Sequence, residues 1–293
     1  MLDQRSEPLG ILRVPRGDFA GVFETVTSGW RAHDPDLPTI ASGMIGSAQG
    51  WLEAPYVDVP ADVGAVARAL ATEPRSGLRI VPGLAQRGAA PDVMRGEETQ
   101  LFGAMTGSSA LARGGTVVLP GTHSKWARIA GGRIEGFRTY MTGELFAVLR
   151  DHSILGRLSD PATPLAVTPG PAFMRGVRVA GEGAGVASIL FTARAAVLVG
   201  DLPAADSVEY LSGLLIGDEV RSALAAGERP RSIIGERSLC DRYAAALREL
   251  GAGEVEALGD TAPAGLWHIG RYAFPRLQRA DASSRSPVSD RAI

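Results

Sequence analysis

Residues 116–140 read TVVLPGTHSKWARIAGGRIEGFRTY, and this stretch decides the fold of the second half of the chain. The run TVVLP and the run KWARIA are joined by the turn GTHS, and a Gly-Gly pair separates KWARIA from a third run, RIEGFRTY. Short β-prone runs joined by Gly-containing turns are typical of antiparallel hairpins. The stretch therefore predicts a three-stranded β-meander that begins near Gly114.

Helices and strands alternate after this meander. Thr142 is a suitable N-cap for a helix that ends near His152, and the prolines between residues 161 and 171 predict a loop that leads into an inserted, mostly helical segment. The pattern of apolar residues then predicts helices over 206–225, 238–250 and 261–272 and strands over 231–234 and 254–258.

The front half repeats this order without a meander. We predict helices over 18–30, 62–71 and from Glu97 to just before Gly114, and strands over 38–41 and 78–81. A duplicated domain, in which a meander is followed by alternating helices and strands, is the architecture of the actin-like ATPases. We therefore predict an α/β fold of two ribonuclease H-like domains around a cleft, the first without its opening hairpin. The predicted domains are residues 1–113 and 114–275, with a helical insertion at about 155–228 and a tail at 276–293.

The composition argues against several classes of protein. The chain has 293 residues, is 45% hydrophobic and contains no apolar run long enough to span a membrane. Its first residues, MLDQRSEPLG, lack the basic start and apolar stretch of a signal peptide. The single cysteine, Cys240, rules out a disulfide framework, and the net charge of −2 carries no basic stripe for nucleic acid. We expect a cytoplasmic protein with no membrane or nucleic-acid partner.

Lys125 is the only lysine among 30 cationic residues, and it lies in the segment LPGTHSKW. Backbone N–H groups, hydroxyls and one ammonium at a Gly-centred turn can hold the phosphates of a nucleotide. An ordinary hairpin with polar tips has the same pattern, so both interpretations stay open here. No GxxxxGK[ST] motif occurs, which disfavours a P-loop kinase.

The segment PDVMRGEETQLFG places Asp92, Arg95, Glu97 and Glu98 at the entry to a helix. A carboxylate there can take a proton from a substrate hydroxyl, and an arginine can hold an anionic group. Carboxylates that only complement the helix dipole give the same pattern.

Three other glycine-containing turns are less specific. In TYMTGELF a strand runs through a Gly turn into a helix, with Glu144 in the first turn, and IIGERS has the same strand, turn and helix order. The stretch GEGAGV at Gly181 lacks the third glycine and the preceding strand of a dinucleotide-binding loop, so we interpret it as structural.

Together these segments resemble the 2-dehydro-3-deoxygalactonokinases over about residues 10 to 272. The resemblance is carried by SGMIGS, GWLEAPYVDVPA, VPGL, PDVMRGEETQLFGA, LPGTHSKW, FRTYMTGELFAVLRDHSILG, EYLSGLLIGDEV, IIGERSLCDRYAAAL and LGDTA. It implies an enzyme that uses ATP and Mg²⁺ to phosphorylate 2-dehydro-3-deoxy-D-galactonate at its 6-hydroxyl in galactonate breakdown.

The resemblance also implies a role for each candidate residue. Glu97 or Asp92 is the implied general base. The implied nucleotide-binding residues are Gly121, Thr122, Ser124, Lys125, Gly235 and Ser238, and the implied sugar-acid residues are Met44, Arg95, Glu98, Thr142 and Glu144. No metal ligand is assigned.

One feature of the family pattern is missing. Members open with a strand and loop resembling DWGTTNLR, the first phosphate loop, and this sequence begins with MLDQRSEPLG instead. We expect either that the start lies upstream of Met1 or that the chain is a shortened relative that transfers phosphate very poorly. A catalytically inactive sugar-acid-binding protein is the alternative function, and a dehydrogenase based on GEGAGV is the third.

Overall fold

The computed structural model describes residues 3–159, 165–274 and 277, and the chain divides into two compact units. Unit 1 comprises Met1–Gly107 and Ala262–Ile293, and unit 2 comprises Ser108–Thr261. Each unit mixes helices with short sheets, so the predicted α/β class is confirmed at this level. The predicted tail at 276–293 lies outside the described residues apart from Leu277.

Unit 1 combines two small sheets with helices. Its described strands pair in the orders β1-β5-β4 and β2-β6-β7. Its elements are the 3₁₀ turns η1 (Ile11–Arg13), η2 (Pro15–Gly17) and η3 (Met44–Gly46), the strands β1 (Ile40–Ala41), β2 (Tyr56–Asp58), β3 (Ala61–Asp62), β4 (Ala71–Thr72), β5 (Arg79–Ile80), β6 (Gly83–Gln86) and β7 (Asp92–Met94), and the helices α1 (Phe19–His33), α2 (Val63–Arg68), α3 (Glu97–Gly107) and α11 (Ala262–Ala273).

The helices of unit 1 begin at the predicted residues. Asp18 caps α1 by accepting a hydrogen bond from the Gly21 N–H at 2.8 Å, and Asp62 caps α2 through the Ala65 N–H at 2.7 Å. The strands were predicted less well, because most contain only two or three residues and so show no alternation of apolar and polar side chains. Asp92 lies in one of these unpredicted strands, β7, and not at the start of α3.

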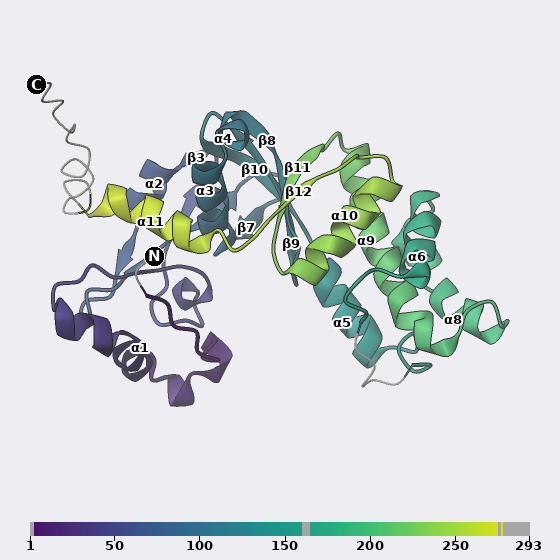
Figure 1. Ribbon diagram of the computed structural model, residues 1–293, viewed down its shortest axis with the longest axis horizontal. Helices are drawn as coiled ribbons and strands as arrows, with labels where there is room; N and C mark the ends of the chain where they lie inside the picture. Colours follow the sequence, from purple (N-terminus) through teal and green to yellow (C-terminus); the bar gives the residue numbers. More distant parts are fainter. Residues whose placement is uncertain (1–2, 160–164, 275–276, 278–293) are drawn as a thin grey trace, which may run out of the picture. The chain divides into compact units, whose positions relative to one another are not determined.

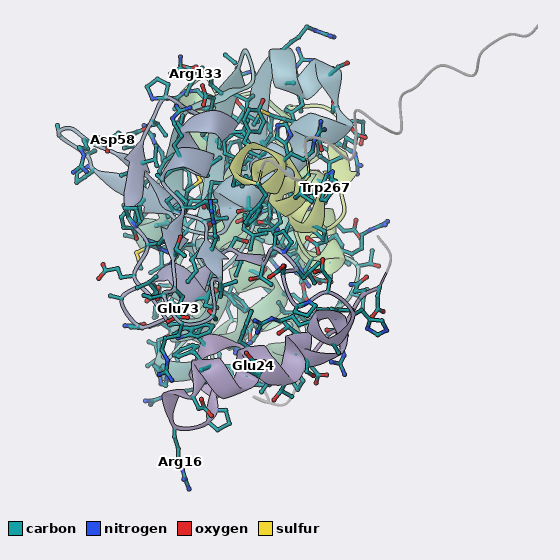
Figure 2. The ribbon with its side chains drawn as sticks, turned by 90° about the vertical axis from the view of Figure 1, so that its left-hand side faces the viewer. Arg16, Glu24, Asp58, Glu73, Arg133 and Trp267 are labelled. Atoms are coloured by element: carbon teal, nitrogen blue, oxygen red, sulfur yellow. The ribbon has the colours of Figure 1, made fainter. Side chains whose placement is uncertain are left out.

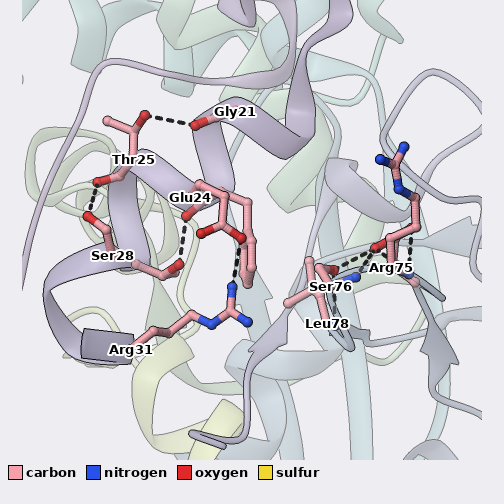
Figure 3. A network of polar contacts seen from close by, with 11 residues as sticks. Gly21, Glu24, Thr25, Ser28, Arg31, Arg75, Ser76 and Leu78 are labelled. Atoms are coloured by element: carbon pink, nitrogen blue, oxygen red, sulfur yellow. Dashed lines mark hydrogen bonds and ion pairs between the residues drawn. The ribbon is translucent and has the colours of Figure 1, made fainter. Parts of the chain in front are cut away.

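Polar contacts stabilise α1 and the turn that follows β4 (Figure 3). Arg31 and Glu24 form an ion pair at 2.7 Å on α1. The Glu73 carboxylate accepts bonds from the Ser76 hydroxyl and from the backbone of the turn, and these bonds lower its pKa. At the start of the unit, Arg16 extends away from the N-terminal segment (Figure 2).

The last described helix, α11, belongs to unit 1, whereas the sequence placed it in the second domain. It packs closely against α3 (Figure 1). A Cβ at Gly265 would lie 1.9 Å from the Thr99 carbonyl oxygen, so only glycine permits this approach. The opposite side of α11 carries Trp267, which is 52% exposed (Figure 2). The chain therefore returns to unit 1, a contact distant in sequence that local patterns cannot reveal.

Unit 2 contains the predicted meander. Five of its strands are ordered β12-β11-β8-β9-β10 (Figure 1); β8, β11 and β12 run parallel, and β8, β9 and β10 are antiparallel neighbours. Its elements are α4 (Ser109–Arg113), β8 (Gly114–Leu119), β9 (Ser124–Ala130), β10 (Arg133–Tyr140), α5 (Thr142–His152), α6 (Pro171–Gly181), α7 (Val186–Ile189), α8 (Thr192–Leu198), η4 (Ala204–Asp206), α9 (Ser207–Ala225), β11 (Pro230–Ile234), α10 (Arg237–Glu249) and β12 (Glu256–Leu258).

The core of unit 2 forms where the sheet meets α6, α9 and α10. Trp126 of β9, Phe173 of α6 and Tyr243 of α10 are among its fully buried side chains. Cys240 also lies in this core, and burial raises the pKa of its thiol to about 11, which leaves it unreactive at neutral pH.

Two further predictions concern loops and membranes. The GEGAGV stretch connects α6, which ends at Gly181, to α7, which starts at Val186, so the expectation that no strand precedes it is confirmed. Part of the proline-rich loop, residues 160–164, lies outside the described residues. No helix in the described part of the chain is long and apolar enough to cross a bilayer.

Candidate active site

The turn between β8 and β9, residues 120–123, is the first candidate feature, and we refer to it as the Gly121 turn. It follows the carboxyl end of β8, at the edge of the sheet where the parallel strands β11 and β12 also end. Ligands of α/β proteins bind outside this edge. Thr122 and His123 are exposed on the turn and can contact a ligand.

The N-terminus of α5 packs directly against the Gly121 turn. The Glu144 N–H donates to the Thr122 carbonyl at 3.0 Å, and a Cβ at Gly143 would lie 2.4 Å from the Gly121 carbonyl oxygen. His123 Nε2 lies 2.5 Å from a carboxylate oxygen of Glu144. The positive end of the α5 dipole therefore lies beside the turn, as in many anion sites.

The turn between β11 and α10 lies next to the Gly121 turn. A Cβ at Gly235 would lie 3.4 Å from the Pro120 carbonyl oxygen. Glu236 caps α10 by accepting bonds from the Ser238 hydroxyl and the Ser238 N–H, and these bonds lower the pKa of Glu236. The structure thus brings the predicted nucleotide residues Gly121, Thr122, Gly235 and Ser238 to one edge of unit 2.

Beneath this edge, four side chains donate to the carboxylate of Glu219 on α9. Ser124 Oγ and Trp126 Nε1 each donate to one carboxylate oxygen at 2.7 Å. Tyr243 Oη donates to the other oxygen at 2.7 Å, and Thr142 Oγ1 donates to that oxygen as well. We call these five residues the Glu219 network.

The network changes two sequence-based expectations. The sequence predicted that Thr142 caps α5, but Thr142 is the first helical residue, Met141 occupies the cap position, and the Thr142 hydroxyl bonds to Glu219. Ser124 is fully buried with its hydroxyl on Glu219. Contacts of Ser124 and Thr142 with ligands remain predictions, and each side chain has a protein partner in this structure.

Lys125 is also buried, with 4% of its surface exposed. Neighbouring residues of a strand point to opposite faces, so Lys125 lies on the face of β9 opposite to Ser124 and Trp126. It pairs in register with Leu119 of β8 and Thr139 of β10. Its predicted contact with ATP phosphates stays a prediction.

In unit 1, the segment Arg95–Glu98 packs against the segment that contains η3. A Cβ at Gly96 would lie 3.2 Å from the Cα of Gly43, and a Cβ at Gly46 would lie 3.0 Å from Arg95 Nη1. The predicted sugar-acid residues Met44, Arg95 and Glu98 therefore come from two adjoining segments, which we call the Arg95 cluster. Thr142 and Glu144, predicted for the same role, belong to unit 2.

The Arg95 guanidinium is only partly satisfied. Nη2 donates to the Ala54 carbonyl at 2.8 Å, and the guanidinium stacks over the Tyr56 ring at 4.4 Å. Nε and Nη1 are buried atoms that have no hydrogen-bond partner among the described residues. Because buried donors are rarely left unpaired, the N–H groups of these two nitrogens are suited to an anionic ligand.

Glu98 is the most strongly perturbed carboxylate of the Arg95 cluster. It is fully buried, and it accepts bonds from the Gly96 N–H at 2.7 Å and from the Thr99 hydroxyl at 3.0 Å. Burial raises the pKa of Glu98 to about 7, against the effect of these bonds, and the neighbouring Glu97 raises it as well. Glu97 itself accepts a bond from the Arg95 N–H.

A separate apolar groove of about 1050 Å³ lies in unit 1 between the N-terminal segment and α1. The apolar face of α1, including Phe19, Val22 and Phe23, lines it, and Met44 lies on it too. It contains none of the predicted carboxylates and does not include Arg95. We therefore do not place a charged sugar acid in this groove.

Two residues of these sites were not among the sequence-based candidates. His123 lies in the quoted turn but was given no role. Glu219 could have been found, because it lies in the long helix α9 among buried apolar residues such as Leu215, Ile216 and Val220, where a buried charge is unexpected. The described residues contain no group of three or more His, Cys, Asp or Glu side chains that could hold a metal ion.

Comparisons with known proteins show the family to which the chain belongs. The model of the 2-keto-3-deoxy-galactonokinase family matches residues 1–269. The 2-dehydro-3-deoxygalactonokinase of Escherichia coli (strain K12) is 37% identical over 264 residues, which are 89% of this chain and 87% of that protein. A Rhizobium meliloti (strain 1021) protein assigned the same activity is 41% identical over 82% of this chain and 79% of its own length.

A solved structure gives the same result. A crystal structure from Sinorhizobium meliloti, assigned as a 2-dehydro-3-deoxygalactonokinase, matches with a TM-score of 0.86 and 37% identity, covering 94% of this chain and 92% of that one. These relatives define the class of protein as a sugar-acid kinase. The chain belongs to the 2-keto-3-deoxy-galactonokinase family.

Proposed function

We propose that the protein transfers the γ-phosphate of ATP to the 6-hydroxyl of 2-dehydro-3-deoxy-D-galactonate. The observation that carries this proposal is the family match over residues 1–269, together with relatives of the named activity at 37% and 41% identity. The match favours a kinase over the inactive sugar-acid-binding alternative. We also infer that units 1 and 2 are two actin-like domains, as the sequence predicted.

We assign the ATP phosphates to unit 2. The Gly121 turn, the N-terminus of α5 and the Gly235 turn meet at one edge of the sheet, which supports this assignment. Gly121 and Thr122 would face the phosphates, Gly235 and Ser238 the nucleoside side, and Ser124 and Lys125 would complete the site from β9.

We assign the sugar acid to the Arg95 cluster. Two guanidinium nitrogens, Nε and Nη1, that have no hydrogen-bond partner among the described residues support Arg95 as the group that holds the substrate carboxylate. Met44 and Glu98 belong to the same cluster, and Thr142 and Glu144 of unit 2 remain proposed contacts. In this assignment unit 1 supplies Arg95 to the sugar acid, and unit 2 supplies the turns that hold the ATP phosphates.

The transfer needs a base for the 6-hydroxyl proton. The hydroxyl oxygen attacks the γ-phosphorus, the bond to the bridging oxygen of ADP breaks, and the hydroxyl proton passes to a carboxylate. The sequence assigned this role to Glu97 or Asp92. The structure favours the start of α3 over Asp92, which lies in β7, and there the pKa of Glu98, about 7, is well placed for a base at neutral pH.

Mg²⁺ would enter the reaction bound to ATP as part of the substrate. Magnesium in such sites usually binds nucleotide phosphates and only one or two carboxylates, so the lack of a larger cluster among the described residues is compatible with it. Because the reaction consumes ATP, we infer a cytoplasmic location.

A coupled assay of ADP release tests the proposal. With ATP and Mg²⁺ present, 2-dehydro-3-deoxy-D-galactonate should stimulate ADP release, whereas galactose, which lacks a carboxylate, should not. Calorimetry with the same sugar acid separates the alternatives. Binding without ADP release would support the sugar-acid-binding relative, and absence of both would reject the assignment.

A further inference from the structure

The Glu219 carboxylate lies at the meeting point of three elements of unit 2. It is 2% exposed, and its four donors come from β9, α5 and α10. All four donors are neutral groups, and two of them bond to each carboxylate oxygen. Every acceptor direction of the carboxylate is thereby used within the protein.

Two of the four donors flank the Gly121 turn. Ser124 is the residue that follows the turn, and Thr142 is the first residue of α5, whose next two residues contact the turn. One oxygen of Glu219 therefore holds the strand that leaves the turn, and the other holds the helix that packs against it. Neither oxygen faces solvent.

A carboxylate is a costly choice for a purely structural contact. Burial raises the pKa of Glu219, and the four hydrogen bonds act against that rise. An apolar side chain would fill the same volume without a desolvation penalty. What the carboxylate adds is direction, because it fixes four donors at defined positions.

We propose that Glu219 is a positioning residue for nucleotide binding: its carboxylate holds the Gly121 turn and the N-terminus of α5 in one fixed arrangement. The proposal rests on the proposed function to the extent that this edge of unit 2 binds the phosphates. Glu219 does not touch the nucleotide and acts through Ser124 and Thr142.

Glu219→Gln tests the two halves of the network separately. Trp126 Nε1 can only donate, so the amide oxygen must face Trp126 and Ser124. The amide nitrogen then faces Thr142 and Tyr243, whose hydroxyls must turn to accept. The substitution therefore loosens α5 more than it loosens β9.

Glu228→Gln is the matched control. The Glu228 carboxylate joins β8 to β9, through Thr116 Oγ1 at 2.8 Å and Arg128 Nη1 at 3.1 Å. These partners face each other across the strands at a point removed from the Gly121 turn. Both variants lose a carboxylate that accepts a hydrogen bond from a side chain of β9.

The first measurement is hydrogen exchange of the protein without ligand. Glu219→Gln should speed exchange at residues 142–144 and, to a smaller extent, at 121–123, and Glu228→Gln should leave both segments unchanged. The second is ATP affinity, with KM and kcat where turnover is seen. Glu219→Gln should raise the Kd and KM for ATP about 10-fold with a smaller change in kcat, and Glu228→Gln should stay within about twofold.

The outcomes separate this proposal from the proposed function. If Glu219→Gln lowers the melting temperature but changes exchange and ATP affinity no more than Glu228→Gln does, Glu219 is only a core residue and the proposal is wrong. If the unmodified protein binds no ATP, the proposed function fails, and the proposed role of Glu219 in nucleotide binding fails with it. Should Glu219→Gln not fold, Thr142→Val removes the α5 bond alone, and unchanged exchange at residues 142–144 would then overturn the proposal.

Discussion

The Arg95 cluster of unit 1 and the Glu219 network of unit 2 each contain a buried glutamate, but the hydrogen-bond donors around the two carboxylates differ. Glu219 accepts four side-chain hydrogen bonds that use both of its oxygens. Glu98 accepts one backbone and one hydroxyl hydrogen bond from its own helix entry, and it lies beside a second carboxylate, Glu97.

The difference shows that a buried glutamate can have a structural role or an acid–base role. Four donors fix Glu219 as part of the framework under the Gly121 turn. Burial raises the pKa of both carboxyl groups. At Glu98 the neighbouring Glu97 adds to the rise, and the pKa of about 7 lets Glu98 gain and lose a proton near neutral pH. Perturbed carboxylates of this second kind are the ones expected to do acid–base chemistry.

The largest expected effect comes from removing the proposed base. Glu98→Gln should lower kcat by about 100-fold to 10,000-fold, because a positioned general base contributes that much. The unmodified enzyme should gain activity as pH rises through about 7, as Glu98 ionises, and the variant should lose this rise. Glu97→Gln is the control on the same helix turn. If Glu97→Gln abolishes the rise and Glu98→Gln keeps it, the two assignments must be exchanged.

Glu98 should also make stability depend on pH. Its folded pKa of about 7 exceeds the value of 4.5 expected in the unfolded chain, so the folded state binds more protons between these values. The contribution of Glu98 to the free energy of unfolding is therefore highest below pH 4.5. It falls by about 3 kcal/mol as the pH rises to about 7. Urea unfolding should show that the stability of Glu98→Gln increases relative to that of the unmodified protein over this pH range. Parallel curves of unfolding free energy against pH would contradict the raised pKa.

A smaller effect is expected from crowding the Gly121 turn. Gly143→Ala places a Cβ 2.4 Å from the Gly121 carbonyl oxygen, so α5 and the turn must separate, at a cost of about 1–3 kcal/mol. Thermal unfolding and ATP titration should both report the loss. Gly29→Ala in α1 adds a methyl group where nothing lies within 4 Å, and it should not destabilise. Equal behaviour of the two variants would mean that this contact is unimportant.

The meander could be predicted because its strands have six to eight residues and Gly-containing turns. The sheets of unit 1 could not, because strands such as β1 and β5 have two residues and are held by pairing between distant segments. For the same reason the return of α11 to unit 1 depends on a contact between Gly265 and Thr99 that no local pattern encodes.

The sequence located the segments that form the candidate site, but it did not show which residues of each segment face a ligand. Sequence motifs selected the Gly121 turn, and the structure adds Gly235 beside it. The exposed hydroxyl of Thr122 and the buried hydroxyl of Ser124 look alike in the sequence, since both follow Gly121 within one polar run. What distinguishes Ser124 is its hydrogen bond to Glu219, a residue some 95 positions downstream that the local sequence does not reveal.

The central claim is that Arg95 of unit 1 binds the sugar acid and Lys125 of unit 2 binds ATP, and calorimetry on two variants tests it most directly. Arg95→Gln should weaken binding of 2-dehydro-3-deoxy-D-galactonate at least about 10-fold and leave ATP within about twofold, because it removes one charged contact to the sugar acid. Lys125→Met, which keeps the apolar stem, should do the reverse. If both variants weaken the same ligand, or if Arg95→Gln weakens only ATP, this assignment of Arg95 and Lys125 is contradicted.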